Sequence, residues 1–167
     1  MNSRLLAIIA GSFVFTAALC ALVAWVLLAS DKAAREGSAR FAAALVAGDA
    51  HAAPNGSFRY LRGVRSHFGE ITSARVIDTR NHRTGHGDDA RTYHLSDVLI
   101  QTPEGPAVIE LEFDGFGPVS DDITDVYELA PRDVPRAALS DAELAALAKA
   151  YDRRGGYPAG DLTFAGR

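Results

Sequence analysis

The stretch from Ala107 to Asp114, AVIELEFD, decides the fold of this chain. Apolar and acidic side chains alternate along it, so that one face carries Ala107, Ile109, Leu111 and Phe113 and the other carries Glu110 and Glu112. A period of two residues is typical of an antiparallel strand with one face on a core and the other in water. We therefore predict a half-buried strand here.

The segments next to this strand extend it into a sheet. The turn TPEGP at 102–106 joins it to a predicted strand over 92–101. Residues 70–79 (EITSARVIDT) and 122–130 (DITDVYELA) have the composition of two further strands. Residues 80–91 (RNHRTGHGDDAR) have the composition of a polar hairpin loop. We expect an antiparallel sheet of about four strands.

Helical patterns flank the predicted sheet. Residues 31–47 are rich in Ala with apolar side chains at helical spacing, and they continue the preceding apolar run as a stalk. Residues 57–70 predict a second helix. The last helix is the best marked, because Ser140 and Glu143 form a capping box at its start and Gly155 follows its basic end.

The N-terminal run from Leu5 to Ala29 predicts a membrane span. It contains no Asp, Glu, Lys or Arg, and at about 1.5 Å per residue it can cross a hydrocarbon core of about 30 Å. Cleavage after Ala29 would place Leu27 where a signal peptidase needs a small residue, so we predict an uncleaved anchor. Ala7 and Gly11 have the small-xxx-small spacing that lets another helix approach closely.

The charges that flank this run leave its orientation open. Arg4 precedes it, whereas Lys32, Arg35 and Arg40 follow it among acidic residues. The count of positive charges slightly favours a cytoplasmic C-terminal domain, but a short N-terminal tail before a long domain is typical of an exporting signal anchor. We expect the domain to be extracytoplasmic.

Composition excludes several classes of protein. The formal net charge is −4 at pH 7, which argues against a dedicated nucleic-acid binder. The single cysteine, Cys20, excludes a disulfide framework within the chain and a cysteine-rich metal or haem site. We expect no cofactor, no structural metal and no nucleic-acid partner.

Two stretches resemble a known superfamily. Residues 41–50, FAAALVAGDA, end the first predicted helix of the domain, and residues 68–73, FGEITS, lead into the first predicted strand. Both are similar to stretches of membrane-tethered or secreted domains of the NTF2-like and cystatin-like superfamily. The resemblance implies a helix wrapped by a curved sheet, often with a pocket at the open end. Members include enzymes and binding or assembly modules, so the resemblance does not choose between them.

Together these patterns predict an α+β protein in three parts. Residues 1–30 are the transmembrane anchor, residues 31–155 are the domain that resembles the NTF2-like and cystatin-like superfamily, and residues 156–167 are a flexible tail. In the domain, helices pack on a curved antiparallel sheet of about four strands, with a C-terminal helix added.

Charge is segregated along the chain. Arg59, Arg62 and Arg65 repeat every three residues in the second predicted helix, whereas residues 107–143 hold two Lys or Arg and ten Asp or Glu, a net charge of 2 − 10 = −8. This basic ridge is a candidate interaction surface for lipid phosphates, an acidic partner or the chain's own acidic sheet. Solvated charge without a partner is the alternative.

Metal and catalytic candidates are weaker. One metal candidate lies in the predicted hairpin loop, where glycines leave the geometry unset: His82, His86, Asp88 and Asp89. A calcium candidate lacks the EF-hand pattern: Glu110, Glu112, Asp114, Asp121, Asp122 and Asp125. The pieces available for acid–base catalysis are Tyr60, Tyr93, His94 and Asp97. His94 and Asp97 are three apart on a predicted strand, so they point to opposite faces and form no local dyad.

These observations favour a non-enzymatic role. We expect a single-pass accessory or assembly subunit of a larger membrane protein complex, which binds through Ala7 and Gly11 in its span and through the basic ridge. Self-association into a homo-oligomer stays open. The runner-up is a membrane-tethered domain that binds a small apolar molecule or a lipid, and an enzyme of the same fold is third.

Overall fold

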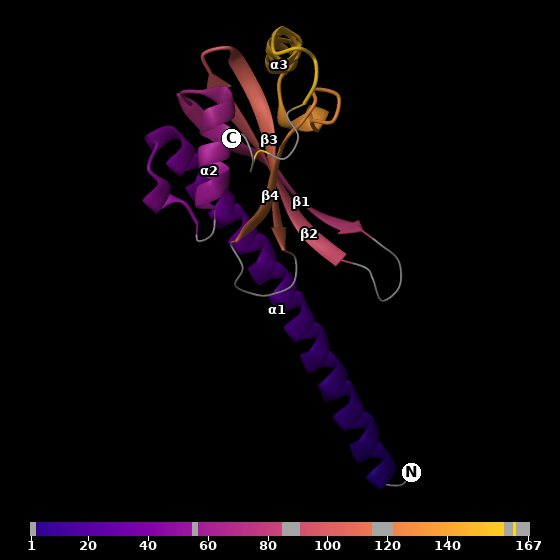
Figure 1. The fold of residues 1–167 in the computed structure, drawn as a ribbon. Coiled ribbons are helices and arrows are strands. Elements are labelled where there is room, and N and C mark those ends of the chain that lie inside the picture. Colours follow the sequence, from indigo (N-terminus) through magenta and orange to yellow (C-terminus); the bar gives the residue numbers. More distant parts are fainter. Residues whose placement is uncertain (1–2, 55–56, 85–90, 115–121, 159–161, 163–167) are drawn as a thin grey trace.

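The computed structural model describes residues 3–54, 57–84, 91–114, 122–158 and 162. They form an α+β fold in which a long N-terminal helix leads into an open, four-stranded antiparallel sheet, and a C-terminal helix follows the sheet (Figure 1). The predicted fold class is confirmed at this level of detail.

Helix α1 (Ser3–Ala47) is one uninterrupted helix of 45 residues. Its apolar half projects from the rest of the molecule (Figure 1), with exposed side chains that include Val14, Phe15 and Leu28. Its C-terminal half packs on the sheet, where Phe41 and Leu45 are fully buried. In the part of the chain that the structure describes, α1 is the one helix long and apolar enough to cross a membrane.

The chain reverses after α1. Gly48 has φ +68° and its amide donates to Ala44 O at 2.9 Å, so it ends the helix in the left-handed conformation that glycine adopts easily. The 3-10 helix η1 (Ala50–Ala52) and helix α2 (Phe58–Phe68) follow. The buried side chains of α2 are Tyr60, Leu61, Val64 and Phe68, whereas Phe58 in the first turn is exposed.

The sheet is a meander of strands in the order β1 (Ser73–Thr84), β2 (Arg91–Thr102), β3 (Gly105–Asp114) and β4 (Ile123–Glu128). Strands β2, β3 and β4 lie close to their predicted bounds. The prediction of a hairpin loop over 80–91 is wrong at its beginning, because β1 continues to Thr84 and pairs with β2 throughout. Polar side chains suit a strand face that water reaches, so composition alone did not distinguish strand from loop.

A β-bulge in β1 decides which side chains share a face. Val76 pairs with Val98, but Asp78 pairs with Asp97, so the register shifts by one residue at Ile77. A one-residue shift moves every following side chain to the opposite face. Without it, Asp78 and the residues at alternate positions after it would point into the main core.

Each face of the sheet packs against helices differently. One face carries Ile109, Leu111 and Phe113 of β3 and forms the main core with α1 and α2. The other face is covered in part by α3 (Asp141–Arg153), whose Leu147 packs with Val108. The 3-10 helix η3 (Arg136–Ala138) precedes α3, and the predicted capping box at the start of α3 is present.

A buried ion pair joins α3 to the main core. Arg154 Nη2 lies 2.8 Å from Glu128 Oε1, and the two side chains are 9% and 2% exposed. Arg154 also lies over the ring of Phe68, so this pair links the end of α3 to β4 and α2. Of the tail predicted to be flexible, Leu162 is buried in the main core, while residues 159–161 and 163–167 lie outside the described part of the chain.

Candidate functional site

The part of the sheet face that α3 leaves open gathers acidic side chains from all four strands. Three cross-strand rows lie there, two residues apart along each strand: Asp78, Asp97, Glu110 and Tyr127; Arg80, Leu95, Glu112 and Asp125; and His82, Tyr93 and Asp114. These rows hold six carboxyl groups, one guanidinium and one imidazole. We call this region the acidic face.

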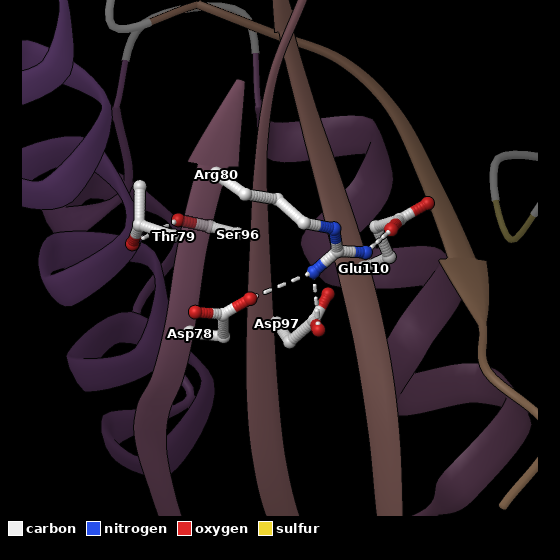
Figure 2. Close-up of polar contacts among 6 residues, drawn as sticks. All are labelled: Asp78, Thr79, Arg80, Ser96, Asp97 and Glu110. Atoms are coloured by element: carbon white, nitrogen blue, oxygen red, sulfur yellow. Dashed lines mark hydrogen bonds and ion pairs between the residues drawn. The ribbon is translucent and has the colours of Figure 1, made fainter. Parts of the chain in front are cut away.

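Arg80 is the centre of the acidic face (Figure 2). Its Nη1 donates to Asp97 Oδ2 at 2.5 Å and to Asp78 Oδ2 at 3.2 Å, and its Nη2 donates to Glu110. These contacts cross three strands, so one guanidinium holds together carboxylates from β1, β2 and β3. The Asp97 side chain has no exposed surface, and its Oδ1 has no hydrogen-bond partner.

Burial raises the pKa of these carboxyl groups. Loss of water contact raises the pKa of Asp97, against the lowering effect of Arg80. The pKa of Glu110 is raised by burial in the same way and lowered in part by Arg80. The pKa of Glu112 is raised first by burial and then by the negative charge of Asp125. Independently of these shifts, the rows hold six carboxyl groups and one guanidinium, so negative charge predominates on the acidic face.

An open groove of about 540 Å³ lies over this face. Its lining side chains come from β1, β2 and β3: Arg80, His82, Thr84, Tyr93, Leu95, Glu110 and Glu112. It combines an aromatic ring and a leucine with two carboxylates of raised pKa. Such a lining suits a cationic group on an aliphatic stem.

The three arginines of the basic ridge have different surroundings. Arg65 is half-buried and donates from Nη1 to Leu45 O at 2.7 Å, so it binds a carbonyl in the last turn of α1. Arg59 donates to Tyr60 Oη at 2.6 Å, and Arg62 lies over the ring of Phe58. Both are exposed. Arg59 and Arg62 are thus available to a partner, whereas Arg65 has a structural contact.

The catalytic candidates do not meet at one place. The buried His94 lies on the core face of β2, opposite Phe113, whereas Asp97 lies on the acidic face. The predicted separation of this pair is confirmed. Tyr60 is buried and donates from Oη to Thr124 O, which ties α2 to β4. Tyr93 shares the acidic face with Asp97.

The metal candidates fall partly outside the described residues. His82 lies on β1 and lines the groove, but His86, Asp88, Asp89 and Asp121 are not among the residues that the structure describes. Asp114 and Asp122 are exposed, and Asp125 accepts from Tyr127 Oη. Within the described ranges, no group of three or more His, Cys, Asp or Glu side chains could hold a metal ion.

Ala7 and Gly11 lie in the first turns of α1, in a stretch whose side-chain surroundings are outside what the structure describes.

Sequence reasoning missed Arg80 as a site residue. It assigned Arg80 and His82 to a loop, and it interpreted Glu110 and Glu112 as a solvated strand face. The charge pattern gave no signal for the contact with Glu110, since Arg80 lies on β1 and Glu110 on β3, with β2 between them.

In comparisons with known proteins, the chain matches no protein-family model, no curated protein and no solved structure.

Proposed function

We propose that this protein is a non-enzymatic, membrane-anchored accessory or assembly subunit of a larger membrane protein complex. One observation carries the proposal: α1 is a single helix with an apolar N-terminal half, whose described side chains from Val14 to Trp25 are exposed, and with a C-terminal half that belongs to the core of the domain. A bilayer would cover the exposed apolar side chains. The chain would then be a single-pass membrane protein with an extracytoplasmic NTF2-like or cystatin-like domain.

The continuity of α1 has a mechanical consequence. A helix without a break keeps the domain close to the bilayer and rigidly joined to its span, unlike a flexible linker. This rigid connection favours a role in assembly, because a partner that packs on the span also constrains the position of the domain. Two charged surfaces are then available to partners: Arg59 and Arg62 on α2, and the acidic face.

The alternative, a tethered domain that binds a lipid or small apolar molecule, has less support. A ligand pocket of this architecture would lie between the helix and the sheet. That space is filled, because the side chains of Phe41, Leu45 and Phe113 are fully buried there in one hydrophobic cluster. The described groove over the acidic face is polar and open, which does not suit an apolar ligand.

Gentle extraction of the tagged full chain from its own membranes tests the proposal. We expect a discrete large species on a native gel, with stoichiometric companions identified by mass spectrometry. Migration as a lone monomer or homodimer, with no companion, would contradict the proposal.

A charge-reversal variant identifies the surface involved. Arg59→Glu with Arg62→Glu changes the two exposed arginines and spares Arg65, whose contact with Leu45 O supports the fold. Loss of companions from this variant would assign the contact to the basic ridge. Arg136→Glu with Lys149→Glu, the same change of net charge at exposed positions elsewhere, controls for a general effect of charge.

A further inference from the structure

Among the described residues, the three rows of the acidic face hold six carboxyl groups and one guanidinium. Arg80 alone serves Asp78, Asp97 and Glu110. Asp97 is fully buried, yet its Oδ1 has no partner, and Figure 2 shows its carboxyl group pointing to the guanidinium that lines the groove. Asp97 itself does not line the groove, but Glu110 and Glu112 do, so a ligand in the groove can reach these two carboxylates and supply them with further donors.

The groove has the shape and lining for a basic side chain. Tyr93 and Leu95 offer an aromatic ring and an aliphatic surface, and Glu110 and Glu112 stand beside them. A lysine or arginine stem packs on the first pair while its charged end meets the second. An anionic or apolar ligand would satisfy neither carboxylate.

The groove also lies where another membrane protein can reach it. The end of β1 approaches the level at which the apolar half of α1 begins, because Arg35 and Ala39 of α1 lie beside Asp78 and Thr79 and β1 continues to Thr84 at about 3.3 Å per residue. Figure 1 shows β1 and β2 extending toward the N-terminal half of α1, away from α3.

We infer that this groove binds a Lys- or Arg-bearing segment of a partner membrane protein, at the side of the domain nearest the bilayer. The inference rests on the proposed function and names the chemistry of the partner. Charge complementarity carries it: six carboxylates share one guanidinium across the three rows, and the groove offers the aromatic and aliphatic contacts that basic side chains use.

A peptide-binding measurement tests the inference. The full chain is placed in nanodiscs of neutral phosphatidylcholine, so that lipid charge does not bind the probe. The probe is a fluorescent peptide of alternating arginine and glycine, and its control has citrulline, an uncharged isostere, at every arginine. We expect the arginine peptide to bind at least about tenfold more tightly than the citrulline peptide.

Variants locate the binding. Glu110→Gln with Glu112→Gln should weaken arginine-peptide binding roughly tenfold, and Glu112→Gln alone, which leaves the contacts of Arg80 intact, by a few-fold. Glu104→Gln with Asp152→Asn removes the same charge at exposed positions outside the groove and should change binding less than twofold. Equal loss in both double variants would overturn the inference, because it would indicate long-range attraction only.

Two further outcomes separate this inference from the proposed function. If the wild-type chain is extracted with companions but the Glu112→Gln chain binds peptide as tightly as wild type, the groove inference fails and the subunit proposal stands. If the chain is extracted alone, the subunit proposal fails whatever the peptide does. Self-association that Arg59→Glu with Arg62→Glu abolishes would make a second copy the occupant and would also overturn the inference.

Discussion

Nη1 of Arg80 lies 2.5 Å from Oδ2 of Asp97, a carboxylate with no exposed surface. The two residues are 17 positions apart and meet only because β1 pairs with β2. Without Arg80, Asp97 would be an uncompensated charge inside the domain. The ion pair therefore favours the observed pairing of β1 with β2, which brings the two side chains together. It also makes Arg80 the residue on which the acidic face depends.

Removal of Arg80 should destabilise the fold. We expect Arg80→Gln to lower the free energy of unfolding by about 3 kcal/mol, since it leaves Asp97 buried and charged without a partner. Thermal unfolding of the full chain in detergent, followed by circular dichroism, should show a melting temperature lower by on the order of 10 °C. Adding Asp97→Asn should restore part of the loss. An Arg80→Gln chain as stable as wild type would show that the pair contributes little.

Stability should depend on pH through the acidic face. The pKa values of Asp97, Glu110 and Glu112 are raised on folding, so the folded chain binds more protons than the unfolded chain between the two sets of values. Their effect on stability is therefore most favourable below the ordinary carboxyl pKa of about 4 and is lost as pH rises through the raised values. As pH falls from neutral toward the ordinary carboxyl pKa, we expect a smaller gain in stability in Glu110→Gln with Glu112→Gln than in wild type. Thermal unfolding of both chains at each pH measures the difference.

The capping box of α3 predicts the opposite trend for Glu143. Hydrogen bonds from the backbone and side chain of Ser140, and then from Arg75, lower the pKa of Glu143 to about 2. Its contribution is present above the ordinary carboxyl pKa and is lost as pH falls toward 2. Ser140→Ala should cost about 1 kcal/mol of stability and raise the pKa of Glu143 toward its usual value. Carbon-detected NMR titration of the side-chain carboxyl group measures this shift, and an unchanged pKa would contradict the role of Ser140.

The arginines of the basic ridge should differ in how much each contributes to the stability of the fold. Arg65 donates to Leu45 O at 2.7 Å, beside the left-handed Gly48. We expect Arg65→Ala to cost about 1 kcal/mol, and Arg62→Ala, at an exposed position, to cost less than about 0.5 kcal/mol. Urea unfolding of the full chain in detergent compares them. Equal costs would mean that the contact with α1 adds nothing to stability.

Orientation in the membrane is testable with the single cysteine removed. In a Cys20→Ser background, we expect Ala145→Cys, on the exposed side of α3, to react with a membrane-impermeant maleimide in intact cells. Ser3→Cys, on the other side of the apolar run, should react only after permeabilisation. The reverse pattern would place the domain in the cytoplasm.

Local patterns predicted much of the fold. Alternation in AVIELEFD identified β3 and its core face, because a strand turns successive side chains to opposite sides. Ser140 and Glu143 marked the start of α3, because the capping box involves residues three apart. The limits of β1 escaped prediction, since Arg80 and His82 have no apolar neighbours at alternate positions to mark them as strand.

The apolar run, the order of the elements and the concentration of acidic residues in the second half of the chain can all be predicted from the sequence alone, since each depends only on composition and short spacing. Which charges meet depends on the tertiary structure. Arg80 contacts Asp97 and Glu110, 17 and 30 residues away, and the bulge at Ile77 places it on their face. Register and bulges depend on the partner strand and on what each face packs against, so they are settled only when the whole sheet assembles.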